Sequence, residues 1–200
     1  MSLWYKAGVL SRPLTRESPD GDEDALLAEL AQGSERALRT VYRHHHEAVR
    51  ALARRLLGHE ADAEELVQEV FVSLPAAMRG YRGQSSLRSF TLGITTNHAR
   101  HFVRAAARRR SAVHRFAHEP KSELAPAADE RVVREQLAER LMCAMDQLSH
   151  DQRVAFVLCE VEERSSEEAA AILGIPSSTI RARLGAARQK LQSLLSEEWP

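Results

Sequence analysis

Apolar residues recur at every third or fourth position over most of the chain, which is the spacing of one face of an α-helix. No segment shows the strict alternation of apolar and polar residues that is typical of a half-buried strand. The pattern therefore predicts an all-α fold. The expected helices cover residues 24–42 with a break at Gly33 and Ser34, 49–57, 62–74, 87–110, 132–148, 152–161, 166–173 and 177–195.

Two segments lack this periodicity and indicate where the domains end. Residues 1–22 contain two prolines, two glycines and many polar residues, and we expect a flexible tail there. Residues 111–129 contain two further prolines and no clear period, which is typical of a linker. The chain is therefore expected to form two small helical domains, residues 23–110 and 130–200, joined by a flexible linker.

The composition agrees with a soluble helical protein. Aromatic residues make up only 5% of the chain and hydrophobic residues 44%, so the cores are built mainly from Leu, Val and Ala. The N-terminal apolar stretch is too short and interrupted for a signal peptide, and no later stretch approaches the length of a membrane span. We expect a cytoplasmic protein with no membrane insertion of its own, in which Cys143 and Cys159 are reduced core residues.

Charge is strongly segregated, although the net charge is zero. Residues 81–118 contain eight arginines and no acidic residue, and residues 174–196 contain four basic residues and again no acid. The rest of the chain carries 16 basic and 28 acidic residues. This distribution predicts two surfaces that face DNA on a body that otherwise avoids it.

The second acid-free window contains a helix-turn-helix pattern, SSEEAAAILGIPSSTIRARLGAARQKL. Gly174 ends the first helix, and Pro176 suits the first turn of the next one. A helix-turn-helix places its second helix in the major groove, where arginine reads guanine. The ordinary alternative is an amphipathic hairpin with a solvated basic face. The candidate DNA contacts are Ser177, Ser178, Thr179, Arg181, Ala182, Arg183 and Arg188.

The first acid-free window predicts a second nucleic-acid surface, because its polar residues recur at helical spacing on one face. Tyr81 and Phe90 lie near this surface and could stack on unpaired bases, although Phe90 is equally well read as a core residue. The arginines could alternatively serve only solubility. The candidates are Tyr81, Arg82, Arg88, Asn97, Arg100, His101, Arg104 and Arg108.

The stretch ADAEELVQEVFVSL predicts an acidic helix that cannot be a DNA face. Asp62 is a suitable N-cap, and Glu65 follows three residues later as in a capping box. The exposed acids suit a basic protein partner, whereas the ordinary alternative is a solvated charged face. The candidate partner contacts are Asp62, Glu64, Glu65, Gln68 and Glu69.

Two motif sets together resemble a known family. DAEELVQEVF, YRGQSSLRSF and ITTNHARHFVR are similar to the second conserved region of extracytoplasmic-function sigma factors of bacterial RNA polymerase. MDQLSHDQRVAFVLCEVEERSSEEAAAILGIPSSTIRARLGAARQKL is similar to their fourth region. The resemblance covers residues 24–195. Phe90, His101 and Pro75 depart from it, because the family commonly has Trp, Asp and a Trp-like residue there.

The resemblance implies a function and partners. The acidic helix would bind the clamp helices of the polymerase β′ subunit, and the C-terminal domain would contact the β flap. The loop after Gly80 and the helix carrying Asn97, Arg100 and Arg104 would recognise and open the minus-ten promoter element. The helix from Ser177 to Arg188 would read the minus-thirty-five element. An anti-sigma factor would hold the protein inactive.

Two other function classes remain for comparison. A stand-alone helix-turn-helix regulator accounts for residues 132–195 but leaves the acidic helix and the first basic helix unexplained. A metal-dependent enzyme is disfavoured, because three consecutive histidines point in different directions around a helix and His114 and His118 have only Glu119 nearby. No phosphate loop or nucleophile motif occurs. We therefore expect no catalytic residues, no metal and no cofactor.

Overall fold

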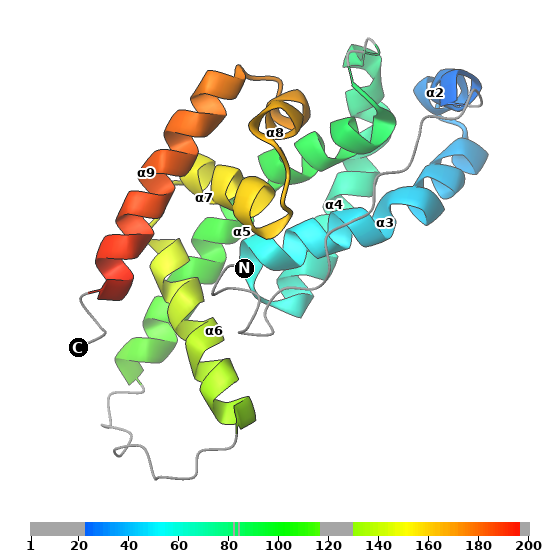
Figure 1. Ribbon diagram of the computed structural model, residues 1–200. Coiled ribbons are helices and arrows are strands. Elements are labelled where there is room, and N and C mark those ends of the chain that lie inside the picture. Colours follow the sequence, from blue (N-terminus) through cyan, green and yellow to red (C-terminus); the bar gives the residue numbers. More distant parts are fainter. Residues whose placement is uncertain (1–22, 82, 84, 117–129, 197–200) are drawn as a thin grey trace.

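The computed structural model describes residues 23–81, 83, 85–116 and 130–196 (Figure 1). These residues form helices and turns without a strand, which confirms the all-α prediction. The predicted tail, residues 1–22, and most of the predicted linker, residues 117–129, lie outside the described residues.

The first domain is a bundle in which α3, α4 and α5 pack against one another, with α2 at one end (Figure 1). Both glycine-containing breaks that the sequence predicted are present. Ser34 caps α3 by accepting a hydrogen bond from the Ala37 amide, and Gly58 ends it in a left-handed conformation. The elements are α2 (Glu23–Ala31), α3 (Glu35–Leu57), α4 (Glu60–Ala77), the 3-10 turn η1 (Met78–Gly80) and α5 (Leu87–Phe116).

The start of α4 differs from the prediction. The helix begins at Glu60, with His59 as an N-cap that makes no side-chain hydrogen bond, so Asp62 is not the cap. The left-handed Gly58 turns the chain directly into the new helix. Asp62 therefore lies inside the first turn, where its carboxylate pairs with Arg109 of α5. At the other end Pro75 lies within the last turn of α4.

The second domain consists of α6 (Glu130–Asp146), α7 (His150–Phe156), the π-turn η2 (Val157–Val161), α8 (Ser166–Leu173) and α9 (Ser177–Ser196). Ser149 and Ser165 each form a complete capping box at the start of α7 and α8. Gly174 is left-handed and separates α8 from α9, as the helix-turn-helix pattern predicted. The apolar face predicted for α9 is also present, because Ile180, Leu184, Ala187 and Leu191 are buried.

The helix α5 is longer than the periodicity indicated. It continues through residues 111–116, which the sequence pattern assigned to the linker. No proline or glycine occurs between Arg110 and Phe116 to stop the helix.

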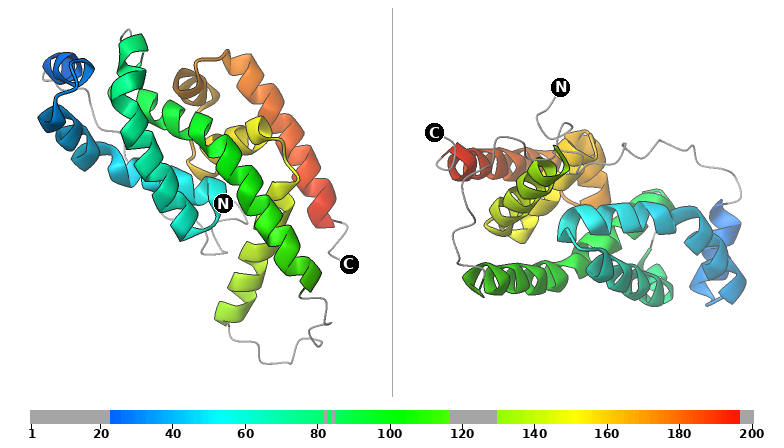
Figure 2. Two further views of the ribbon diagram at one scale, coloured as in Figure 1. Left: turned by 180° about the vertical axis from the view of Figure 1, so that it is seen from behind. Right: turned by 90° about the horizontal axis from the view of Figure 1, so that it is seen from below.

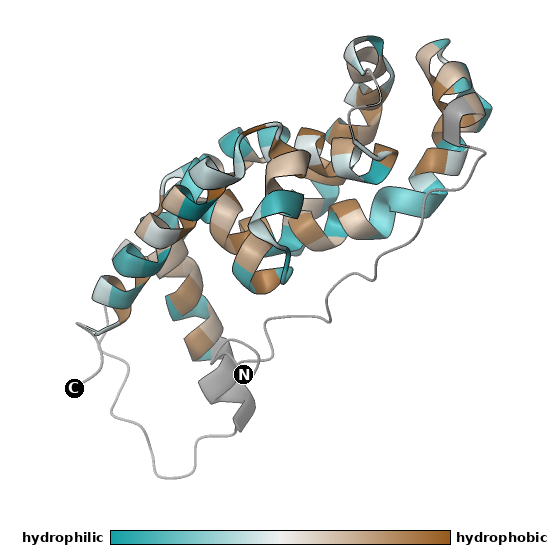
Figure 3. Cartoon of the chain, turned by 45° about the horizontal axis from the view of Figure 1, so that its top comes forward, coloured by the Kyte–Doolittle hydropathy of each residue, from teal (hydrophilic) through white to brown (hydrophobic). Residues whose placement is uncertain are grey.

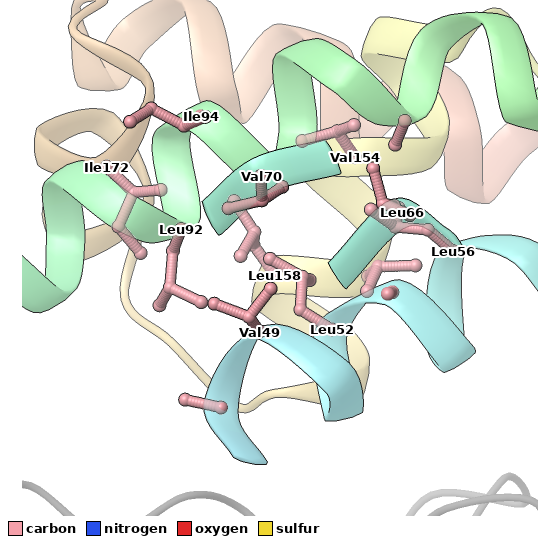
Figure 4. Packing of buried hydrophobic residues seen from close by; sticks show 14 of the residues in the cluster. Val49, Leu52, Leu56, Leu66, Val70, Leu92, Ile94, Val154, Leu158 and Ile172 are labelled. Carbon is pink, nitrogen blue, oxygen red and sulfur yellow. The ribbon is translucent and has the colours of Figure 1, made fainter. Parts of the chain in front are cut away.

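The two domains lie against each other as two layers, which is clearest from below (Figure 2, right). The α5 helix contacts α6, α7 and α8, and the end of α3 contacts η2. Hydrophilic and apolar bands alternate along the helices, as expected for amphipathic elements (Figure 3). Buried residues of both domains form one core, in which Leu158 of η2 lies near Val49 and Leu52 of α3 (Figure 4).

Candidate nucleic-acid interface

The α9 helix presents its predicted DNA-contacting residues on the side away from its buried apolar face. Ser178, Arg181, Ala182 and Arg188 are exposed. Ser177, Thr179 and Arg183 are half-buried. The geometry thus provides a basic, hydroxyl-bearing surface on the second helix of a helix-turn-helix, which is the element that enters the major groove in such motifs.

Each of the three arginines on α9 pairs with an acid from an earlier element of its own domain. Arg181 Nη1 lies 3.0 Å from Glu167 Oε1. Arg183 Nη2 lies 2.7 Å from Asp151 Oδ2, and Arg188 Nε donates to Glu160 Oε1 at 2.9 Å. Sequence reasoning missed these pairs, because residues 174–196 contain no acid and the partners come from 14 to 32 positions earlier. The pairs orient the guanidinium groups before any ligand binds.

The predicted polar face of α5 is also present. Asn97, Arg100, His101, Arg104 and Arg108 are all exposed. The opposite face contains Thr91, Thr95 and Thr96, whose buried hydroxyls donate to carbonyl oxygens in the preceding turn at 2.8–2.9 Å. These threonines therefore satisfy their polar groups locally. Among the outer arginines, Arg100 donates to Asp151 Oδ1 at 3.2 Å, so phosphate would compete with a carboxylate for this side chain.

Tyr81, in the loop before α5, is not a freely exposed aromatic side chain that could stack on a base without moving. Tyr81 is half-buried, its ring centroid lies 4.6 Å from that of Phe90, and its hydroxyl donates to the Ser85 carbonyl oxygen. Phe90 is likewise half-buried and packs against the core, which agrees with its reading as a core residue, and its stacking on unpaired bases stays a prediction. Arg88 is half-buried. Arg82 lies outside the described residues.

The acidic helix α4 does not present its five predicted contacts as one face. Asp62 pairs with Arg109 and is largely buried, and Glu64 Oε1 lies 2.5 Å from Arg50 Nε. Glu69 contacts two histidines of α5, with Oε1 2.6 Å from His98 Nδ1 and Oε2 3.4 Å from His101 Nε2. Glu65 and Gln68 are exposed.

A nearby apolar residue was not part of the prediction. Val72 lies one turn after Gln68 on α4 and is 81% exposed, which is unusual for a large aliphatic side chain. The helical spacing of Glu65, Gln68 and Val72 places them on one side of α4. The sequence does contain a signal for this exposed residue. Val67, Val70, Phe71 and Leu74 follow the helical spacing of the buried face of α4, and Val72 is an apolar residue that falls outside that spacing.

A cluster of buried charges lies where the two domains meet. Arg153 is fully buried, and its Nη1 lies 3.0 Å from Asp146 Oδ1. The pKa of Arg153 is lowered to about 10, mainly by burial, and the Asp146 carboxylate opposes this shift. The guanidinium therefore stays charged at neutral pH. Burial also raises the pKa of the half-buried Cys159 thiol, which favours the protonated form.

Among the described residues, no three His, Cys, Asp or Glu side chains come together in a way that could hold a metal ion. None of the described helices combines the length and apolar character needed to cross a bilayer.

Comparison with known families gives a match for each domain. The sigma-70 region 2 model matches residues 41–109, and the sigma-70 region 4 model matches residues 138–191. The ECF RNA polymerase sigma factor SigE of Mycolicibacterium smegmatis is 33% identical over 159 residues, which cover 78% of this chain and 60% of that protein. RNA polymerase sigma factor CnrH of Cupriavidus metallidurans is 29% identical over 90% of this chain and 98% of its own length.

Two solved structures share the fold over most of the chain. CnrH in complex with the cytosolic domain of CnrY has a TM-score of 0.59 at 26% identity, covering 88% of this chain and 97% of CnrH. The sigma factor RpoE in complex with the anti-sigma factor NepR from Bartonella quintana has a TM-score of 0.51 at 27% identity, covering 79% and 96%. With both conserved regions present in order, the chain belongs to the extracytoplasmic-function sigma factors.

Proposed function

We propose that this chain binds core RNA polymerase, directs it to a specific set of promoters and helps to open them. The observation that carries this proposal is the pair of exposed basic helix faces, one in each family-matched domain. A promoter offers two separate elements to such a protein, and each domain has one surface suited to one element. The regulon would be one that responds to a stress or a signal.

The α9 helix would read the minus-thirty-five element in the major groove. Arg181 and Arg183 lie in its N-terminal half, from which recognition helices contact base edges. Ser177, Ser178 and Thr179 lie in its first turn, where hydroxyls and backbone amides can bind phosphate. The small side chain of Ala182 permits close approach. Arg188 lies two turns later and would contact the backbone.

The exposed face of α5 and the loop before it would bind and open the minus-ten element. Arg100, Arg104 and Arg108 would neutralise phosphates of the separated strands, because backbone charge dominates binding to single-stranded DNA. Asn97 and His101 lie among them and would contact bases or sugars. Tyr81 would stack on an unpaired base after leaving its contact with Phe90. We include Arg82 and Arg88 in this surface.

The α4 helix would bind the clamp helices of the polymerase β′ subunit. Glu65 and Gln68 supply exposed polar groups, and Val72 adds an apolar contact beside them. Charge complementarity to a basic partner would favour and orient the encounter. Asp62, Glu64 and Glu69 would act less directly, because their carboxylates already hold Arg109, Arg50 and His98. The second domain would contact the β flap.

The remaining features of the proposal concern regulation and location. The two similar structures contain the cytosolic domain of CnrY and the anti-sigma factor NepR, which supports an anti-sigma partner for this chain as well. We place the protein in the cytoplasm with the polymerase, and assign it no catalytic residue or cofactor. The match of residues 41–109 to region 2 removes the reason for considering a stand-alone regulator.

Reconstituted transcription tests the proposal. Core RNA polymerase with the purified chain should produce discrete run-off transcripts from genomic DNA cut with a restriction enzyme, and polymerase alone should not. The matched control is the chain with Arg181 and Arg183 both replaced by alanine, which should give fewer transcripts from the same start sites. If the chain adds no start site to those of core polymerase, the proposed function is wrong.

A further inference from the structure

Glu69 of α4 contacts two histidines of α5 with one carboxylate. Its Oε1 lies 2.6 Å from His98 Nδ1, and its Oε2 lies 3.4 Å from His101 Nε2. The two histidines are three positions apart on α5, so they lie on neighbouring turns of the same side of that helix. Each oxygen of the carboxylate therefore faces a different histidine, and Glu69 bridges the two helices.

His98 is the anchored member of this cluster. Its Nε2 lies 3.2 Å from Ser73 Oγ of α4, and Ser73 Oγ itself donates to the Val70 carbonyl oxygen at 2.9 Å. Both ring nitrogens of His98 thus face oxygen atoms of α4, and its side chain is only 28% exposed. Because neither nitrogen points to solvent, His98 serves to fix the position of the Glu69 carboxylate.

His101 is the exposed member of the cluster. Its side chain is 62% exposed, and its ring centroid lies 4.3 Å from that of the buried Phe102. Because Nε2 faces Glu69, Nδ1 is the ring nitrogen left for a ligand. His101 shares one exposed row of α5 with Asn97 and Arg104, which are four and three positions away. The carboxylate therefore orients a ring that lies within the proposed minus-ten surface.

The acids of α4 that form ion pairs lie on two edges of the helix, and Glu69 lies on the edge toward α5. Asp62 is seven positions earlier, on the same side of the helix, and pairs with Arg109 of α5. Glu64 lies on the other edge and pairs with Arg50 of α3. Glu69 therefore acts on the DNA-facing helix directly, whatever else its edge of α4 contacts in the complex.

The histidine at position 101 makes this arrangement particular to this chain. The family commonly has Asp at this position, and a second carboxylate beside Glu69 would be repelled by it. An imidazole can instead donate a hydrogen bond to the carboxylate or form an ion pair with it. The departure of residue 101 from the family pattern therefore creates the contact.

We propose that Glu69 is a positioning residue of the minus-ten surface: by holding Nε2 of His101, it presents Nδ1 of that ring to promoter DNA during strand opening. The proposal rests on the proposed function, which assigns His101 to DNA. A side chain that is already oriented loses less rotamer freedom on binding than one that samples several rotamers. Open promoter should therefore form less readily when the Glu69 carboxylate is removed.

The sign of the effect distinguishes positioning from simple electrostatics. Glu69→Ala removes an acid beside a phosphate-binding face, and on charge alone this change should strengthen DNA binding. Positioning predicts the opposite result. Glu29→Ala removes the same charge from an exposed position on α2 and is the matched control, which should match the unmodified chain. Alanine favours helix, so both variants should keep their helix content by circular dichroism.

A double-mutant cycle tests whether Glu69 acts through His101. Holoenzyme is formed with saturating chain, so that weaker polymerase binding by a variant does not affect the result. Permanganate reactivity of thymines, on a promoter found by run-off transcription, gives the equilibrium ratio of open to closed complexes. We expect Glu69→Ala and His101→Ala each to lower this ratio by at least about threefold, and the double variant to lower it no further.

A second cycle, between Glu69→Ala and His98→Ala, tests the structural alternative. If Glu69 only ties α4 to α5, its effect should be coupled to that of His98 and independent of His101. Additive effects of Glu69→Ala and His101→Ala, or stronger opening by Glu69→Ala, would overturn the proposal. If the unmodified chain opens no promoter, the proposed function fails and this inference fails with it. Normal opening by the unmodified chain with an additive first cycle overturns only the inference.

Discussion

Each arginine of α9 pairs with an acid in the protein, and in the proposed complex a group on the DNA would compete for it. Arg181 and Glu167 form a solvent-exposed pair, and such pairs contribute only about 0.2–1 kcal/mol. Arg188 is also exposed, although its partner Glu160 is half-buried. A bidentate contact of arginine with guanine contributes about 1–3 kcal/mol to discrimination between bases. We therefore expect DNA to displace these acids, and we expect the pairs to act mainly by limiting the orientations that the free side chains sample.

The first prediction concerns these base contacts. Arg181→Ala or Arg183→Ala should weaken binding of the holoenzyme to its promoters by about 1–3 kcal/mol, with the loss concentrated on particular upstream base pairs. Affinity measured against a set of single-base promoter variants checks this, with Gln189→Ala on the exposed side of α9 as control. A uniform loss over all sequences would indicate a phosphate contact. No loss from either change would mean that α9 does not lie in the groove.

The second prediction concerns the exposed acid of α4. Glu65→Lys should weaken association with core polymerase several-fold, because it reverses charge on a surface proposed to face a basic partner. The helix content should not change, since the side chain is exposed. Competition binding against the unmodified chain measures the effect, and Glu29→Lys on α2 provides the same charge change elsewhere. Equal losses for the two variants would argue against the α4 surface.

At the scale of elements, local residue chemistry predicted most of the fold. Ser34, Gly58 and Gly174 act within a few residues of their own positions, so their caps could be read from the sequence. The start of α4 could not, because the glycine turn places His59 at the cap and leaves Asp62 to pair with Arg109 of a distant helix.

The sequence predicted which helix faces carry the candidate DNA-binding residues, but it did not predict the acids that pair with their arginines. The exposed faces of α5 and α9 follow from helical periodicity alone. The acids that hold their arginines come from other elements and become visible only after the domains fold and dock. Asp151 illustrates this, because in the sequence it is only a residue in the first turn of a short helix. The exposure of Val72 likewise depends on how α4 packs.

The third prediction concerns the loop and α5 acting together. Tyr81→Ala combined with Arg104→Ala should leave binding to the upstream element largely intact but block strand opening, because only unpaired bases offer a face on which Tyr81 can stack and Arg104 is proposed to hold the separated strands. Run-off transcription from duplex promoters and from a template with a pre-melted bubble distinguishes the steps. The bubble should rescue this variant more than it rescues Arg181→Ala. Normal transcription from duplex templates would show that melting uses another surface.

On the scale of the whole molecule, the zero net charge has a structural meaning. Acids of the second domain pair with basic residues of both domains: Asp151 contacts Arg100 of α5 and Arg183 of α9, and Glu160 contacts Arg188 of α9. The negative charge that balances the two acid-free segments of the sequence therefore lies partly beside them in the fold.

The fourth prediction concerns the pH dependence of docking. His150 Nε2 donates to the Thr96 carbonyl oxygen at 2.9 Å across the domain contact. Burial lowers the pKa of His150 below its ordinary value of 6.5, and the nearby Arg100 and Arg153 act in the same direction, whereas the Thr96 hydrogen bond and Asp151 oppose them. The neutral imidazole is therefore the docked form. Docking is fully stabilised above about pH 6.5 and weakens as the pH falls through the lowered pKa.

Scattering measured from about pH 7.5 to about pH 5.5 checks this expectation. The radius of gyration of the free protein should increase toward acid pH. His150→Gln, whose amide can donate to the same carbonyl without titrating, should show a smaller increase. An identical response in both proteins would assign the pH dependence to other groups, and His59→Gln, which changes an exposed histidine, is the control for a general effect.

Strand opening at promoters is the property that unites the two domains, the two basic surfaces and the polymerase. It is measured by the permanganate reactivity of promoter thymines in the presence of core polymerase and this chain. We expect reactive thymines in the minus-ten region of the promoters that give run-off transcripts, and none with either component alone. The Tyr81 and Arg104 double variant should lose them while the upstream element stays protected. If no genomic promoter yields reactive thymines with the unmodified chain and active core polymerase, the proposed role in promoter opening is contradicted.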